Sequence, residues 1–258
     1  MLKVGVLGAA GRMGQTVCVA VEGDPELQLV AAVDLAGEGQ KQADISSFVD
    51  AGVDVAVDFT TRDAAIEHLR WLAEHGIHAV VGTTGFNDAD MEEMRGLFEG
   101  DRLLESGVAA PNCIIAPNFA ISAVLMMRFA ELAAPHFSSA EIIEFHHDKK
   151  IDAPSGTALA TMRRMEAASQ DWNADPTQSV ALPGVRGGSG EHGVKVHAVR
   201  AEGLVAHQEV ILGCAGQSLT IRQDSYDRVS FMPGVLLAVK AVSGRPGLTI
   251  GLDSLLGI

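Results

Sequence analysis

A glycine-rich turn near the start of the chain constrains the fold more than any other feature of the sequence. Gly8-Ala9-Ala10-Gly11-Arg12-Met13-Gly14 follows the apolar run 4–7 and opens a stretch with helical spacing. Small residues at such a turn let the backbone approach a pyrophosphate, whose charge is then stabilised by free amides and the positive end of the helix dipole. The strand, turn and helix together predict the first unit of a dinucleotide-binding domain.

An acidic residue stands where this kind of domain needs one. Asp34 ends the second apolar run, 20 residues after Gly14, where a carboxylate accepts hydrogen bonds from the adenosine ribose. Short polar or glycine-containing turns follow the later apolar runs. Because ligands of open α/β sheets bind beyond the carboxyl ends of the strands, we predict that these turns also border the cofactor, NADH or NADPH. Their candidate residues are Phe59, Thr60, Gly82, Thr83, Thr84, Ala116, Pro117, Asn118 and Phe119.

Asp34 also bears on the choice between the two cofactors. Its carboxylate favours ribose hydroxyls and repels a 2′-phosphate, and the following Leu35-Ala36-Gly37 supplies no cation. Arg12 could swing toward a phosphate, and the repulsion is worth only about tenfold at a wetted site. We therefore predict that NADH binds at least as well as NADPH, with dual use allowed.

Short apolar strands alternate with helical stretches through the first half of the chain, which is typical of a doubly wound, Rossmann-like parallel sheet covered by helices on both faces. After about residue 117 the pattern becomes mixed and predicts a second, α+β domain. We expect strands at 4–7, 29–33, 53–59, 78–81, 140–147 and several between 194 and 225, helices at 12–22, 62–75, 88–98, 119–134, from about 156, and at 234–242, and a long surface loop at 171–193.

Charge and composition exclude several classes of protein. A formal net charge of −14 opposes binding to nucleic acid, which depends on clustered Lys and Arg. No apolar run approaches the roughly 18 residues of a membrane span, and the first residues enter a strand pattern without a leader, so we expect a cytoplasmic protein. Cys18, Cys113 and Cys214 are too far apart to suggest a disulfide framework or a zinc site.

A second group of reactive side chains lies within residues 141–158. If the strand alternation persists, His146 and His147 point to opposite sides and have different roles. The amides and hydroxyls of Ser155-Gly156-Thr157, at the start of a helix, could hold a carboxylate, and Lys150 adds positive charge. Two simpler interpretations are a solvated strand end for the histidines and an ordinary helix cap for Ser155.

Other kinds of chemistry fit this segment less well. The paired histidines lack a third metal ligand at recognisable spacing, so we expect no metal. The sequence has no Gly-x-Ser-x-Gly elbow of a serine hydrolase. Hydride transfer remains as the chemistry that uses both the dinucleotide turn and this segment.

These motifs together resemble the 4-hydroxy-tetrahydrodipicolinate reductase (dihydrodipicolinate reductase) family over nearly the whole chain. The most specific match is Glu144-x-His146-His147-x-x-Lys150-x-Asp152-x-Pro154-Ser155-Gly156-Thr157-Ala158. It is supported by the turn at 8–14, by Gly82-Thr83-Thr84-Gly85 and by Ala116-Pro117-Asn118-Phe119.

The resemblance implies a discontinuous dinucleotide-binding domain, 1–117 plus 230–258, and an inserted substrate-binding and oligomerisation domain, 118–229, in a homotetramer. It implies reduction of a small cyclic dicarboxylate by NAD(P)H in the diaminopimelate route to lysine. His146 and Lys150 would be the acid catalysts, and the sequence does not rank one above the other. The residues implied in substrate binding are His147, Lys150, Ser155, Gly156, Thr157 and Arg228.

Two other functions remain open at this point. A dinucleotide-binding sensor without turnover would keep the fold, but Lys150 and the intact Ser-Gly-Thr turn argue against it. A related amino-acid dehydrogenase would share the dinucleotide turn, but it would not explain the His-His-x-x-Lys segment.

Overall fold

The structure is a computed structural model of the 258-residue chain, and it describes residues 1–34, 44–99 and 110–258. The chain divides into two compact units. Unit 1 comprises Met1–Phe119 and Phe231–Ile258, and unit 2 comprises Ala120–Ser230. These bounds lie within a few residues of the expected domain limits, and the roles assigned to the two domains stay predictions.

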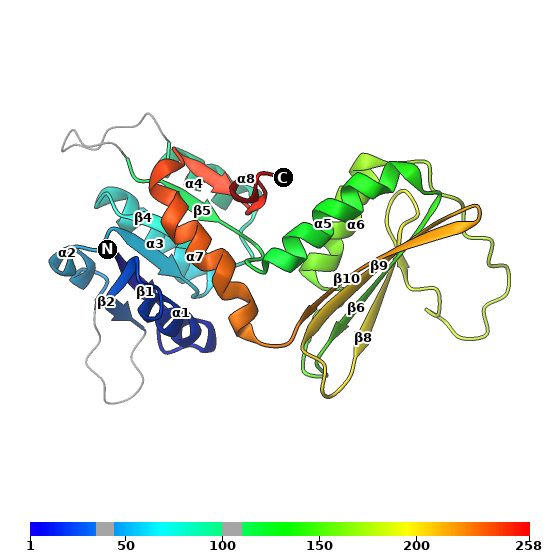
Figure 1. The fold of residues 1–258 in the computed structure, drawn as a ribbon, viewed down its shortest axis with the longest axis horizontal. Coiled ribbons are helices and arrows are strands. Elements are labelled where there is room, and N and C mark those ends of the chain that lie inside the picture. Colours follow the sequence, from blue (N-terminus) through cyan, green and yellow to red (C-terminus); the bar gives the residue numbers. More distant parts are fainter. Residues whose placement is uncertain (35–43, 100–109) are drawn as a thin grey trace. The chain divides into compact units, whose positions relative to one another are not determined.

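Unit 1 is built around a six-stranded parallel sheet (Figure 1). The strand order β11-β5-β4-β3-β1-β2 reverses direction at β1, because the chain continues to β2 on one side and to β3 on the other. Such a reversal is the place where open α/β sheets bind ligands. The strands are β1 (Leu2–Leu7), β2 (Leu27–Val33), β3 (Val55–Asp58), β4 (His78–Val81), β5 (Cys113–Ile115) and β11 (Leu248–Ile250).

Helices bury this sheet. All four residues of β3 are buried, as a strand covered on both faces requires. Helix α1 packs with α7, and α3 packs with α4; a core that includes Phe48, Leu69 and Phe98 fills the space beneath α2, α3 and α4. The helices of unit 1 are α1 (Arg12–Glu22), α2 (Ser47–Ala51), α3 (Arg62–Glu74), α4 (Asp88–Leu97), α7 (Met232–Ala241) and α8 (Asp253–Leu256).

Unit 2 is a mixed sheet with the order β10-β9-β6-β8-β7, and α5 and α6 lie side by side against it (Figure 1). Along β6, Ala140, Ile142 and Glu144 are buried, whereas the alternate residues are half-exposed on the opposite face. The elements are α5 (Ile121–Ala133), β6 (Ser139–His146), α6 (Gly156–Ala168), β7 (Gly188–Ser189), β8 (Lys195–Arg200), β9 (Ala206–Cys214) and β10 (Gln217–Ser225).

The predicted fold class is confirmed, and the differences are local. Strand β3 begins at Val55 rather than at residue 53, because the amide of Val53 donates to Phe48 O and closes α2 past Gly52, whose φ is +65°. Strand β6 ends at His146, because a turn closed by Lys150 N and His147 O follows it. Strand β5 was expected only as an apolar run before the turn at 116–119, without a range, and β11 and helix α2 were not expected.

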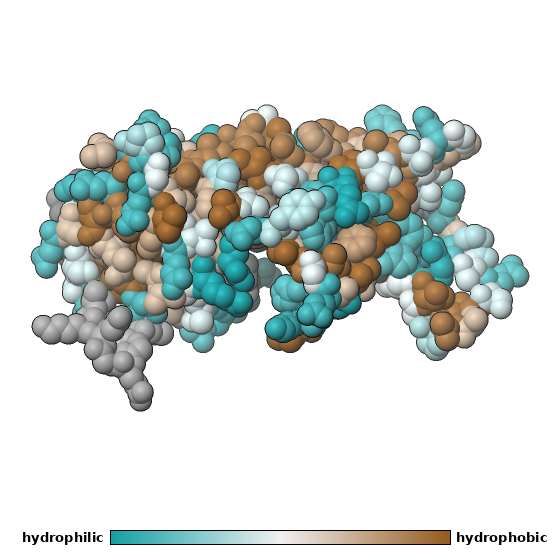
Figure 2. Space-filling view, turned by 60° about the horizontal axis from the view of Figure 1, so that its bottom comes forward, coloured by the Kyte–Doolittle hydropathy of each residue, from teal (hydrophilic) through white to brown (hydrophobic). Residues whose placement is uncertain are grey.

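Figure 2 shows both hydrophilic and apolar residues exposed on one face of the molecule. Within the described ranges, no helix is both long enough and apolar enough to cross a bilayer.

Candidate active site

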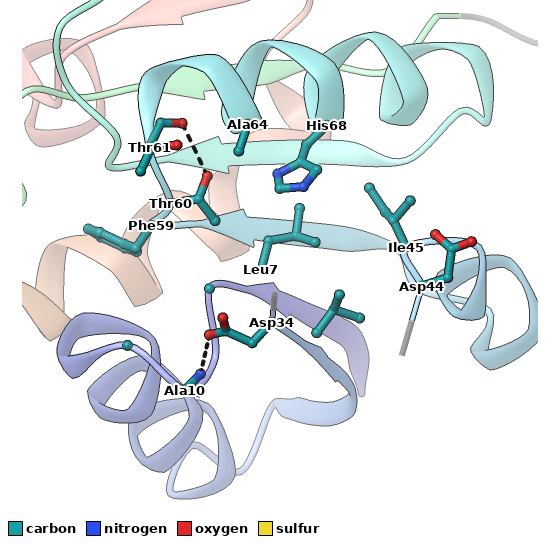
Figure 3. A pocket seen from close by; sticks show the side chains of 13 residues that line it. Leu7, Ala10, Asp34, Asp44, Ile45, Phe59, Thr60, Thr61, Ala64 and His68 are labelled. Atoms are coloured by element: carbon teal, nitrogen blue, oxygen red, sulfur yellow. Dashed lines mark hydrogen bonds between the residues drawn. The ribbon is translucent and has the colours of Figure 1, made fainter. Parts of the chain in front are cut away.

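A cavity of about 910 Å³ opens in unit 1 beyond the carboxyl ends of β1, β2 and β3 (Figure 3). The glycine-rich turn and Asp34 line it from one side. Phe59 and Thr60 follow β3, and His68 points into the cavity from α3. The cavity therefore lies at the strand reversal of the sheet, where a dinucleotide would be expected.

The glycine-rich turn has no room for larger side chains. Gly8 has a φ of +78°, and a Cβ atom there would lie 2.8 Å from Phe59 O. A Cβ atom on Gly14 would overlap the carbonyl oxygen of Gly8. Among the described residues, no side chain caps the start of α1 at Gly11. The first amides of this helix are thus available to an anion, as a pyrophosphate site requires.

Asp34 makes a contact that the sequence did not indicate. Its Oδ2 accepts a hydrogen bond of 2.6 Å from Ala10 N, so the carboxylate also fixes the glycine-rich turn to the end of β2 (Figure 3). The cation-poor segment Leu35-Ala36-Gly37, on which the cofactor prediction partly depends, lies outside the described residues.

The later turns predicted to border the cofactor meet around Phe59. Its ring lies 5.8 Å from the ring of Phe119, and a Cβ atom on Gly82 would overlap it. Thr83 is buried beside Thr60, to whose amide its hydroxyl lies at 3.0 Å. Of the remaining predicted cofactor residues, Ala116 is buried, Ala9, Met13 and Asn118 are half-buried, and Arg12, Thr84 and Pro117 are exposed.

Asp58 and His68 were missed by sequence reasoning. Asp58 is fully buried at the end of β3, where Oδ1 accepts hydrogen bonds from the amide and hydroxyl of Thr60 and from Thr83 Oγ1. Its other oxygen lies 2.7 Å from His68 Nδ1. An acidic residue at the end of an entirely apolar strand was the one available signal, because a charge is buried there only when it is paired.

In unit 2, one buried carboxylate gathers the predicted catalytic segment. Glu144 is 0% exposed. Its Oε2 lies 2.6 Å from His146 Nδ1 and 2.7 Å from Arg200 Nη1, and its Oε1 lies 2.8 Å from Arg200 Nη2 and 3.0 Å from Ser155 N. The end of β6, the end of β8 and the start of α6 are therefore tied to a single side chain. We call Glu144, His146, Arg200, Asp152 and Lys150 the inner cluster.

These contacts shift the ionisation of both members of the pair. Burial opposes ionisation of Glu144, but hydrogen bonds from Arg200 and His146 outweigh it and hold the pKa of this carboxyl below its usual range. Burial also lowers the pKa of His146; Glu144 opposes this shift, and the charges of Lys150 and Arg200 reinforce it. At neutral pH the inner cluster thus combines a carboxylate, a guanidinium and a histidine that gives up its proton readily.

Lys150 joins the inner cluster through the loop after β6. Its Nζ lies 2.7 and 2.8 Å from the two carboxylate oxygens of Asp152, whose pKa is lowered chiefly by this lysine. Arg200 Nη2 in turn donates to the carbonyl oxygen of Asp152 at 2.7 Å. His147 is exposed and stands just past the end of the strand.

The Ser-Gly-Thr turn starts helix α6 as predicted. Ser155 is buried, and its hydroxyl oxygen caps the helix by accepting from Ala158 N at 3.2 Å. A Cβ atom on Gly156 would meet open space, and Thr157 is half-buried beside it. Arg228 is exposed in the short 3-10 helix Arg228–Phe231. The roles of these residues in substrate binding stay predictions.

The opposite face of β6 carries a second cluster of the same residue types. Glu141 Oε2 lies 2.6 Å from His197 Nε2, and its Oε1 lies 2.5 Å from Arg186 Nη2. Asp175 lies 3.4 Å from Arg186 Nε and 3.1 Å from Lys195 Nζ. We call these five residues the outer cluster. Within the described ranges, neither cluster nor any other group of His, Cys, Asp and Glu is arranged to hold a metal ion.

Comparison with known proteins bears on both units. The family model described as "Dihydrodipicolinate reductase, N-terminus" matches residues 2–119, and the one described as "Dihydrodipicolinate reductase, C-terminus" matches residues 122–256. Two curated relatives named 4-hydroxy-tetrahydrodipicolinate reductase, from Corynebacterium urealyticum and Cutibacterium acnes, are 51% and 52% identical and cover 100% of both chains.

A solved structure is similar over the same length. It is a dipicolinate-bound dihydrodipicolinate reductase from Paenisporosarcina sp., with 38% identity, a TM-score of 0.86, and coverage of 98% of this chain and 99% of that chain. The similarity therefore extends over both the dinucleotide cavity and the inner cluster.

Proposed function

The chain belongs to the dihydrodipicolinate reductase family, and we propose that it reduces 4-hydroxy-tetrahydrodipicolinate to tetrahydrodipicolinate in the diaminopimelate route to lysine. The observation that carries this proposal is the inner cluster, in which Glu144 ties His146 to the start of α6. An acid and a carboxylate-binding turn then stand in one rigid frame. A small cyclic dicarboxylate is the substrate class that uses both.

The residues of unit 1 fit a nicotinamide dinucleotide. The start of α1 at Gly11 has no side-chain cap, and the tight contacts at Gly8 and Gly14 keep this turn free of larger side chains, so its backbone suits the pyrophosphate. Asp34 lines the cavity, where its carboxylate would bind the ribose. When bound, this cofactor supplies the hydride that the substrate ring accepts at C4. Every other requirement of the reaction falls to side chains of the chain itself.

The first of these requirements is a proton donor. Loss of the substrate hydroxyl as water needs an acid, and a protonated ring accepts a hydride more readily; a positioned acid is worth roughly 10²- to 10⁴-fold in rate. His146 presents its Nε2, since Nδ1 is directed at Glu144. Lys150 supplies a cation held by Asp152. We assign proton delivery to these two residues.

Binding of the two substrate carboxylates is the second requirement. The open space at Gly156 lets an anion approach the start of α6, and Thr157 carries a hydroxyl there. We place one carboxylate on Ser155, Gly156 and Thr157, with His147 and Lys150 nearby. The exposed Arg228 supplies a further cation for the dicarboxylate.

The reaction is tested by mixing the purified enzyme with reduced cofactor and freshly made 4-hydroxy-tetrahydrodipicolinate. We expect the nicotinamide absorbance to fall only when enzyme and substrate are both present, and dipicolinate to slow the reaction competitively. Absence of turnover with NADH and with NADPH, in a sample that still binds the cofactor, would favour the sensor interpretation instead.

We further propose that NADH serves at least as well as NADPH. Asp34 and Asp44 both line the cavity, so its wall carries negative charge where a 2′-phosphate would have to approach. Asp34→Ala should raise kcat/KM for NADPH relative to NADH, by about tenfold or less at a wetted site. A strong preference for NADPH that Asp34→Ala leaves unchanged would contradict this assignment.

Unit 2 also supports assembly into a homotetramer. Helices α5 and α6 cover one face of its sheet, whereas Ile143, Phe145 and Ile211 are only half-buried on the other. Edge strand β10 exposes Leu219 as well. Other copies of the chain seated on β9 and β10 would cover this apolar surface and protect the edge, and would leave the outer cluster, which reaches from β6 to β8, open to solvent. Light scattering should give the mass of four chains, and a monomer at working concentration would refute the proposal.

We also propose that the enzyme works in the cytoplasm. Cys18, Cys113 and Cys214 are all free thiols, which suits a reducing compartment. Cell fractionation should recover the activity in the soluble fraction, and recovery with membranes or in the medium would contradict the proposal.

A further inference from the structure

We propose that Glu144, with Arg200 as its fixed counter-charge, is the positioning residue of this reaction: it holds His146 in the tautomer that presents Nε2 to the substrate and sets Lys150 and the start of α6 in the same frame. This inference rests on the proposed function, because it assigns roles around the same site. It adds two residues, Glu144 and Arg200, that contact no reacting atom.

The carboxylate of Glu144 has no capacity left for a ligand. Each of its two oxygens has two donors, all within 2.6–3.0 Å, and the side chain is 0% exposed. A carboxylate in this state does not bind substrate or move a proton to solvent. Its contribution is the fixed position of the groups that donate to it.

The contact with His146 decides which nitrogen faces outward. A fully paired carboxylate can only accept, so the histidine nitrogen at 2.6 Å carries a proton. Neutral His146 is therefore the Nδ1–H tautomer, and a proton that arrives or leaves does so at Nε2. Without the carboxylate the ring could also adopt the other tautomer, in which Nε2 already carries its proton and has no lone pair to take one up.

Arg200 extends the same frame to the other proposed acid. Its two terminal nitrogens bind both oxygens of Glu144, and Nη2 also reaches the carbonyl oxygen of Asp152, whose carboxylate holds Lys150. The planar guanidinium suits this double contact, which a lysine could not reproduce. One ion pair thus orients His146 directly and Lys150 through the loop at 150–152.

A further contact of Glu144 orients the carboxylate-binding turn. The amide of Ser155 donates to Oε1, while the hydroxyl of the same residue caps the helix. Because an amide of this kind could otherwise bind a ligand, the contact removes the Ser155 amide from those that can, and the Ser155 hydroxyl occupies the amide of Ala158. The geometry thereby fixes the distance between the acid and the carboxylate site.

The outer cluster provides a matched control on the same strand. Glu141 also contacts a histidine and an arginine, but its side chain is 30% exposed against 0% for Glu144, and it touches neither the loop at 150–152 nor the start of α6 in the described structure. Glu141→Gln changes the same atoms as Glu144→Gln. It should therefore report the effect of losing such a carboxylate without its positioning role.

The experiment compares Glu144→Gln and Glu141→Gln with the wild-type enzyme. We expect Glu144→Gln to lower kcat by about 10²-fold, because an acid that is out of position loses much of the rate enhancement that it provides. The KM for the cofactor should be unchanged. Because Glu144 supports the protonated form of His146, the fall of kcat with rising pH should move to lower pH. Glu141→Gln should keep kcat and its pH profile.

Two further variants separate positioning from simple loss of folding. Glu144→Asp keeps the charge and should recover part of kcat. Glu144→Gln combined with Arg200→Met removes both charges of the ion pair, so it should fold at least as well as Glu144→Gln alone, and its kcat should stay low. If kcat recovered in this double variant, the defect of Glu144→Gln would be the unpaired arginine, and the positioning role would be wrong.

The outcomes also separate this inference from the proposed function. If the wild-type enzyme fails to oxidise the cofactor with substrate, the proposed function is wrong. If the wild-type enzyme turns over and folded Glu144→Gln keeps its kcat and pH profile, only the positioning role is overturned. A lowered kcat with an unshifted pH profile and no recovery in Glu144→Asp would likewise reduce Glu144 to a structural residue.

Discussion

Strand β6 carries two clusters of the same five residue types, Glu, His, Arg, Asp and Lys, on its opposite faces. The inner cluster is centred on a carboxylate that is 0% exposed, whereas the central carboxylate of the outer cluster is 30% exposed. Residue type and distance alone do not distinguish them, since both have contacts near 2.6 Å. What distinguishes the two clusters is the burial of the central carboxylate and the segments of the chain that it connects.

The difference has a physical reason. Charges that water can reach are screened and gain little from pairing, so the ion pairs of the outer cluster add little to stability. A buried carboxylate must be paired on every side, and the groups that pair with it lose their freedom to move. The charged groups of the inner cluster therefore lose contact with water but are held in one arrangement, which an active site needs and a surface does not.

The largest expected effect separates the lysines of the two clusters. Lys150→Ala should lower kcat by roughly 10²- to 10⁴-fold, because the ammonium interacts most strongly as charge redistributes in the transition state. Lys195→Ala, which removes the lysine of the outer cluster, should leave kcat within a few-fold of wild type. Steady-state kinetics with both substrates varied would show this. If Lys150→Ala only raised KM, lysine would be a carboxylate anchor.

The next effect is on stability and separates the arginines. Arg200→Met leaves the buried Glu144 without its counter-charge, with contacts only to His146 and Ser155 N, so the free energy of unfolding should fall by about 3–5 kcal/mol. Arg186→Met removes a partner from a half-exposed glutamate and should cost about 0–1 kcal/mol. Urea denaturation measures both. Equal losses would show that burial does not distinguish the two clusters.

A smaller effect concerns the threonines. Thr157→Val should raise the substrate KM by roughly 10- to 100-fold with kcat nearly kept, because a hydrogen bond to a charged carboxylate is worth about 1.5–3 kcal/mol in ground and transition states alike. Thr177, whose hydroxyl binds Asp175 of the outer cluster at 2.6 Å, supplies the control Thr177→Val, with KM unchanged. A kcat loss in Thr157→Val at constant KM would contradict uniform binding.

The smallest effect is the response of stability to acid. The pKa of Glu144 is lowered in the folded chain by Arg200 and His146 against the opposing effect of burial. Its contribution to stability is therefore present above about pH 4.3, the usual glutamate value, and is lost as the pH falls through the lower folded value. Glu144→Gln should flatten the acid dependence of the unfolding free energy below that pH, and Glu141→Gln should retain it.

The sequence predicts those parts of the two sites that are local in the chain. The turn at 8–14 and the segment 146–157 were identified because strand, turn and helix follow each other within a few residues. Glu144 was visible in the same motif, but its role was not. Strands β5 and β11 have three residues each, too few for a periodic pattern to indicate them.

What the sequence could not supply are partners brought together by the sheet. Arg200 reaches Glu144 across 56 residues because β8 pairs in parallel with β6 and sets His146 opposite Arg200. His68 meets Asp58 only because α3 packs over the sheet. Register and helix packing depend on the whole core, so no local pattern contains them.

The most direct test is the tautomer of two histidines in one nitrogen-15 NMR spectrum, recorded at about pH 9, where histidines are neutral. His146 directs Nδ1 at Glu144, whereas His197 directs Nε2 at Glu141. With both signals assigned from His146→Gln and His197→Gln, we expect His146 to be protonated on Nδ1 and His197 on Nε2. A proton on Nε2 of His146, with Nδ1 bare, would contradict the account, because Glu144 would then not hold the ring.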